Sequence, residues 1–109
     1  MSGVAIYPEQ IMKKVFTLID EKKKPARMVE LAKKTINKYI KRERKKTLTE
    51  GMDFWDFACQ FGANAEEALP VHFKQLFVAI DQAEKDAAES FYVEIVAKEV
   101  KRTRKPVED

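Results

Sequence analysis

Residues 25–46 have the sequence PARMVELAKKTINKYIKRERKK, in which apolar residues recur at steps of three and four. This period is typical of an amphipathic helix, and Pro25 stands at the first helical position, where proline is favoured. The apolar stripe consists of Val29, Ala32, Ile36, Tyr39 and Ile40. At about 100° per residue, the opposite face carries Arg27, Lys34, Lys38, Lys41 and Lys45. The stretch therefore predicts a long helix with one core face and one strongly basic face.

Three other stretches predict strands, and one predicts a second helix. Residues 14–19 are β-branched and aromatic and are apolar on both faces, as expected for an interior strand. Residues 52–61 and 90–100 alternate apolar and polar side chains, which is typical of half-buried strands. Between them, residues 71–88 repeat apolar side chains with a helical period.

The resulting element order, βαβαβ, predicts a two-layer α/β domain: a three-stranded sheet with two amphipathic helices packed mainly on one face. Because each helix is long enough to return the chain to its starting edge, parallel pairing with right-handed crossovers is expected. Sheet orders 1-2-3 and 2-1-3 both remain open. The predicted core joins Trp55, Phe57, Phe61, Phe91, Val93 and Ile95 to Val29, Ile36, Phe73, Phe77 and Ile80.

A chain of 109 residues is the size of one domain. We expect an N-terminal arm at 1–11, a single globular domain at 12–100 and a basic, mobile C-terminal tail at 101–109. The single cysteine, Cys59, allows no intrachain disulfide, which fits a reducing compartment. No apolar run reaches the length of a membrane span, and the N-terminus lacks a secretory signal pattern. A cytoplasmic protein without a membrane association is therefore expected.

The net charge of +3 conceals a strong separation of charge along the chain. Residues 12–50 hold 14 lysines and arginines against 5 acidic residues, whereas residues 51–97 hold 2 against 9. Such a basic lobe can bind a polyanion, and arginine adds planar forks suited to phosphate. The candidate nucleic-acid-binding residues are Arg27, Lys34, Lys38, Lys41, Arg42, Lys45, Arg102 and Arg104.

Candidate catalytic groups are few. His72 is the only histidine and begins a predicted helix, while Cys59 lies on the apolar face of a strand, where a thiol is inert. Asp53 and Asp56 are three apart in a strand and point to opposite faces. The common metal, phosphate-loop, dinucleotide and nucleophile motifs are all missing. We therefore predict no enzyme activity, no metal site and no cofactor.

Two aromatic residues, Phe54 and Tyr92, are expected on the outer sheet face. Exposed aromatics on a sheet can stack on unpaired RNA bases, but they can equally be covered by another copy of the chain. The leading hypothesis is a non-enzymatic module that binds RNA or another polyanion through the basic helix face. The alternative is a protein-interaction or self-associating module, such as a homodimer, that uses the outer sheet face and the opposite charge lobes.

Several segments resemble a family of small bacterial proteins classed as a domain of unknown function. They are KPAR (24–27), KYIKRERK (38–45), EGMDFWDF (50–57), SFYVEIVAK (90–98) and RTRKP (102–106). The resemblance covers roughly residues 12–106 and implies a bacterial cytosolic protein, without catalytic or binding residues to carry over. The expected βαβαβ order is also similar to small two-layer RNA-binding domains, such as the C-terminal domain of a translation initiation factor.

Overall fold

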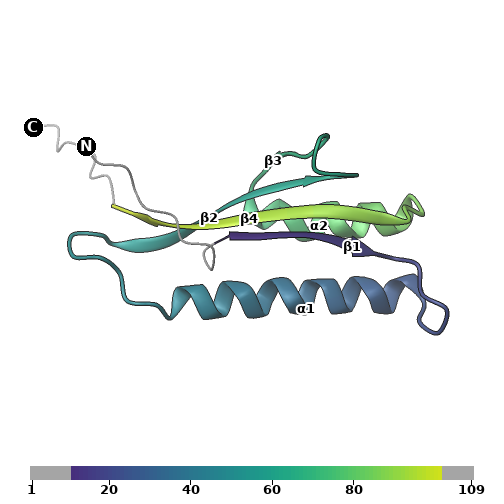
Figure 1. Ribbon diagram of the computed structural model, residues 1–109, viewed down its shortest axis with the longest axis horizontal. Coiled ribbons are helices and arrows are strands. Elements are labelled where there is room, and N and C mark those ends of the chain that lie inside the picture. Colours follow the sequence, from purple (N-terminus) through teal and green to yellow (C-terminus); the bar gives the residue numbers. More distant parts are fainter. Residues whose placement is uncertain (1–10, 102–109) are drawn as a thin grey trace, which may run out of the picture.

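The computed structural model describes residues 11–101, which form two helices and a four-stranded sheet. The elements are β1 (Ile11–Thr17), α1 (Pro25–Arg44), β2 (Phe54–Gly62), β3 (Leu69–Val71), α2 (Phe73–Lys85) and β4 (Ser90–Val100). The sheet order is β1-β4-β2-β3, and every neighbouring pair is antiparallel. Figure 1 shows α1 running along the strands and α2 lying behind the sheet. The prediction of an α/β fold is confirmed, and the prediction of three strands is wrong.

The prediction of parallel pairing is also wrong, and so are both expected strand orders. The βαβαβ order, on which the likeness to two-layer RNA-binding domains rested, is not the observed one. The reason in each case is β3. This strand has only three residues, Leu69–Val71, and pairs with β2 as a hairpin. The hairpin reverses the chain before α2 begins, so α2 returns it to a β4 that runs against β2. Because β4 also runs against β1, β1 and β2 point the same way with β4 between them.

β1 is consequently an edge strand, and not the interior strand that its two apolar faces predict. Phe16 is buried, but Val15 on the other face is 59% exposed. The strand ends at Thr17, so Ile19 falls in the following loop and is also exposed. Because β1 lies at the edge of the sheet, its residues can line a groove together with those of α1.

The core lies on one face of the sheet and has β4 at its centre. Phe91, Val93, Ile95 and Ala97 are each no more than 1% exposed. Both helices pack on this face, since the Phe57 ring contacts Tyr39 of α1 at 6.5 Å and Phe73 of α2 at 6.3 Å between centroids. The two-layer arrangement follows from these contacts. Most of the predicted core residues are buried, while Trp55, Phe61, Phe73 and Phe77 are partly exposed at its margin.

Helix α1 begins where the sequence predicts, at Pro25, and its N-cap Lys24 contributes no side-chain hydrogen bond. The preceding turn is held by Asp20, whose Oδ2 accepts backbone hydrogen bonds from Lys22 at 2.9 Å and Lys23 at 2.8 Å. The hydrogen bond from the Lys22 amide is the main cause that lowers the pKa of Asp20. At the other end, Lys41, Arg42 and Arg44 lie in the last turn, where the helix dipole favours positive charge. Neither described helix combines the length and apolar character needed to cross a membrane.

Gly62, at the end of β2, permits a close approach of the chain after the hairpin turn. A Cβ atom added there would lie 2.7 Å from the Cα of Ala68, with the backbone of Glu67 and Ala68 on the same side. Backbone atoms cannot move aside as the tip of a side chain can. Glycine is therefore needed at position 62 because a side chain would collide with this backbone, and not because the position has a positive φ angle.

We predict that Gly62→Ala lowers the free energy of unfolding by about 1–3 kcal/mol, the usual cost of overpacking. Ala58→Val is the matched control, because Ala58 is exposed on the same strand and should change stability by no more than about 0.5 kcal/mol. Urea denaturation followed by Trp55 fluorescence measures both. Equal stability of Gly62→Ala and the parent would contradict the close approach.

Candidate functional site

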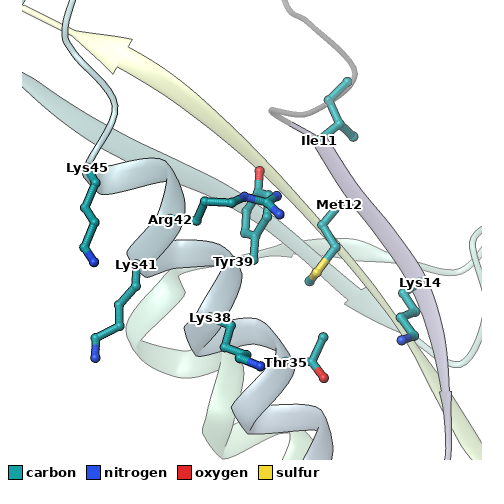
Figure 2. A pocket seen from close by; sticks show the side chains of 9 residues that line it. All are labelled: Ile11, Met12, Lys14, Thr35, Lys38, Tyr39, Lys41, Arg42 and Lys45. Carbon is teal, nitrogen blue, oxygen red and sulfur yellow. The ribbon is translucent and has the colours of Figure 1, made fainter.

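A groove of about 930 Å³ runs between α1 and the edge strand β1. Its lining residues come from both elements and are Ile11, Met12, Lys14, Thr35, Lys38, Tyr39, Lys41, Arg42 and Lys45. Figure 2 shows Met12 and Tyr39 between β1 and α1 with Arg42 across Tyr39, while Lys41 and Lys45 point away from the strand. The groove thus has an apolar floor and a basic rim.

Four of the predicted cations form a line along the exposed face of α1. Lys34, Lys38, Lys41 and Lys45 are all exposed. Within residues 11–101, no carboxylate lies within 4.0 Å of any of their ammonium groups. A second groove, of about 690 Å³, borders the same line on the α2 side and shares Lys38 and Lys41 with the first. We call these four lysines the cationic ridge, and it separates the two grooves.

Other cations of α1 are paired with acids. Arg27 Nη1 lies 3.0 Å from Glu30 Oε1 at the beginning of the helix, with both side chains exposed. Lys33, which is not one of the predicted binding residues, lies 2.7 Å from Asp81 of α2 and so links the two helices. The predicted residue Arg27 therefore lies away from the groove and is partly neutralised.

Arg42 has a defined orientation inside the groove. Its guanidinium carbon lies 5.5 Å from the centroid of the Tyr39 ring, a cation–π contact. The Tyr39 hydroxyl donates to the carbonyl of Ile95 at 3.3 Å and is buried. Burial, followed by the charge of Glu43, raises the pKa of Tyr39 to about 12. The phenol is therefore neutral at physiological pH and serves as a wall of the groove.

Glu43 is a residue of the site that sequence reasoning missed. Its side chain is fully buried, yet it is a carboxylate. Oε2 accepts from Arg42 Nε at 3.2 Å, and Oε1 lies 3.0 Å from Lys46 Nζ without a well-aligned hydrogen bond. The signal was present in the sequence, because Glu43 continues the apolar stripe four positions after Tyr39.

The remaining predicted residues are not brought into this groove. Arg102 and Arg104, like residues 1–10 of the predicted N-terminal arm and most of the predicted tail, lie outside the described residues. Phe54 is 39% exposed at the start of β2, opposite Val100 of β4. Tyr92 is buried, and its hydroxyl donates to Glu94 at 2.9 Å. Since Tyr92 and Val100 are separated by about 27 Å of strand, Phe54 and Tyr92 do not form one aromatic platform.

His72 and Cys59 have structural positions. His72 is the N-cap of α2, where its Nδ1 accepts the backbone hydrogen bond of Lys74 at 3.0 Å. Cys59 is buried on the inner face of β2, and burial raises the pKa of its thiol to about 11, with a smaller contribution from Asp56. Among residues 11–101, no three histidine, cysteine or acidic side chains are grouped as a metal site would need.

Comparison with known proteins places the chain but assigns no activity. The model of a family described as a family of unknown function (DUF6172) matches residues 12–106. No curated protein and no solved structure matches the chain significantly. The sequence resemblance to a domain of unknown function is therefore confirmed, and no residue role comes with it.

We predict that the Cys59 thiol of the folded protein reacts with iodoacetamide at pH 8 about two orders of magnitude more slowly than that of the urea-unfolded chain. The raised pKa leaves little thiolate, which is the reacting species. Mass spectrometry of timed samples measures the rates. Rapid labelling without denaturant would contradict the burial of Cys59.

We predict that His72→Ala lowers the free energy of unfolding by about 1 kcal/mol, since the amide of Lys74 loses its acceptor. His72→Asn should retain nearly full stability, because asparagine is also a good N-cap. Urea denaturation measures both variants. No loss from His72→Ala, or an equal loss from both variants, would contradict the capping role of His72.

Proposed function

We propose that this chain, which belongs to the family of unknown function (DUF6172), binds polyanions, and RNA in particular, through the cationic ridge of α1 and the groove beside it. The ridge and the groove present charges of one sign along one side of a rigid helix. Successive ridge lysines are separated by three or four residues, or about 4.5–6 Å along the helix axis. A regular row of this kind suits a polymer of repeated negative charges.

The observation that carries the proposal is the scarcity of acidic partners along the ridge. Lys34 alone has a glutamate four positions away, Glu30, and that glutamate pairs with Arg27. On an ordinary solvated helix, lysines are stabilised by glutamates three or four positions away. Here Lys34–Lys38, Lys38–Lys41 and Lys41–Lys45 are like-charge pairs at those same spacings. Such pairs destabilise a helix. A polyanion would turn this unfavourable arrangement into a favourable one.

A second element, β1, also contributes positive charge to the groove, which supports the proposal. Lys14 comes from β1 and lines the same groove as Lys38, Lys41 and Arg42 of α1. Within residues 11–101, the ion pairs of these four groups involve one carboxylate, that of Glu43, which pairs with Arg42 and is buried. The potential of the groove toward solvent is therefore positive, which would concentrate an anionic ligand there.

We predict that the protein binds a fluorescein-labelled single-stranded RNA, with a plot of log K against log salt of slope about −3 if four phosphates are contacted. Lys38→Gln/Lys41→Gln should reduce this slope to about −1.5 and weaken binding at every salt concentration. Lys74→Gln/Lys85→Gln, the same charge change on exposed positions of α2, is the control. Fluorescence anisotropy measures all three proteins. Absence of binding at low salt, or affinity independent of salt, rejects the proposal.

The ridge also makes a prediction about stability. Lys38→Gln removes the like-charge pairs with Lys34 and Lys41 and should raise the free energy of unfolding by about 0.5–1 kcal/mol while it weakens RNA binding. Urea denaturation at low salt measures the gain. A loss of stability would mean that this lysine serves the fold.

A further inference from the structure

We propose that the groove between α1 and β1 is a site for unpaired nucleotides, in which Arg42 stacks on a base and binds the adjoining phosphate. This inference rests on the proposed function and deepens it, because it specifies single-stranded nucleic acid as the polyanion. The ridge alone would not distinguish a single strand from a duplex or from polyphosphate, since all three present rows of negative charge. The floor of the groove supplies the distinction.

The floor is apolar and lies directly beside the cations. Met12 is partly buried against the core, and Tyr39 is buried with its ring facing Arg42. Figure 2 shows Arg42 extending across Tyr39 toward β1, whereas Lys41 and Lys45 point away from the strand. In a duplex, the base faces are covered by stacking, and polyphosphate has none. Only a single strand offers both an exposed base, which can lie beside Met12 and on the outer face of Arg42, and a phosphate for the rim.

Arg42 is oriented for both contacts. Its Nε donates to the buried Glu43 at 3.2 Å, and its guanidinium carbon lies 5.5 Å from the centroid of the Tyr39 ring. The side chain is nonetheless 63% exposed. Among the described residues its guanidinium is ion-paired with Glu43, and the hydrogen bond of that pair comes from Nε and not from a terminal nitrogen. The outer face can therefore stack on a base, and the terminal nitrogens can form a forked contact to phosphate.

Glu43 acts here as a positioning residue. A guanidinium on an exposed side chain ordinarily samples many orientations, and ordering it on binding reduces affinity. Contacts to Tyr39 and Glu43 restrict Arg42 before a ligand arrives. A buried carboxylate is costly unless it is paired. Its position beneath Arg42 and beside Lys46 is consistent with this orienting role.

The test compares three labelled probes at one salt concentration: a 12-nucleotide single-stranded RNA, an RNA duplex of the same length, and inorganic polyphosphate of 12 phosphates. We expect the single strand to bind at least tenfold more tightly than polyphosphate and more tightly than the duplex. Equal affinities for all three probes, or tighter binding of the duplex, would overturn the inference and leave the proposed polyanion binding intact. If none of the probes binds, the proposed function fails as well.

Arg42→Lys tests whether this side chain causes the preference for single-stranded RNA, because the substitution keeps the positive charge and removes the planar guanidinium. We expect about a tenfold loss of single-strand affinity, in line with the loss of one stacked base, and less than a twofold change for polyphosphate. Arg44→Lys is the matched control, because Arg44 lines the other groove and lies over Phe57. Equal losses from the two variants, or no loss from Arg42→Lys, would overturn the role of Arg42.

Glu43→Gln tests the positioning role through the ratio of the two affinities. We expect the preference for single-stranded RNA over polyphosphate to fall about threefold or more, with circular dichroism unchanged. A purely structural or purely electrostatic role would alter both affinities by the same factor. An unchanged ratio in a folded Glu43→Gln protein would overturn that role.

Discussion

The structure depends on the burial of one face of β4 between its two neighbours. Phe91, Val93, Ile95 and Ala97 on that face are almost completely excluded from water. Burying this face requires both helices on the same side of the sheet, and α1 is held there in part by the hydrogen bond from Tyr39 to Ile95. With β4 and β2 in the centre, β1 is left at the edge. The groove exists because α1 runs beside that edge.

Helix α1 combines two requirements that oppose each other. Its apolar stripe fills the core, whereas the line from Lys34 to Lys45 repeats positive charge at spacings that weaken a helix. Packing of the apolar stripe stabilises the helix despite that repulsion, since most helical stability in proteins comes from such packing. Glu43 lies on the buried face of the helix, but it forms ion pairs with the basic residues Arg42 and Lys46. It links the core to the groove through Arg42.

Local patterns predicted the elements better than their arrangement. The strand at 90–100 and the start of α1 at Pro25 agree with the structure, because alternation and helical period are properties of adjacent residues. The three-residue strand Leu69–Val71 is too short to show any period and contains Pro70. Without this strand, the prediction lacked the reversal of chain direction that the β2–β3 hairpin produces. That single omission turned an antiparallel sheet into a predicted parallel one. The interior position expected for β1 had a different source, the apolar residues on both of its faces.

The amino-acid sequence alone accounts for the cationic ridge, since the helical period places Lys34, Lys38, Lys41 and Lys45 in one line. It also determined which face of α1 enters the core. The position of Met12 and Lys14 opposite Tyr39 and Arg42 is visible in the folded chain alone, because it depends on which strand lies beside the helix. Strand order results from long-range pairing between segments far apart in the chain. No pattern within a single segment carries that information.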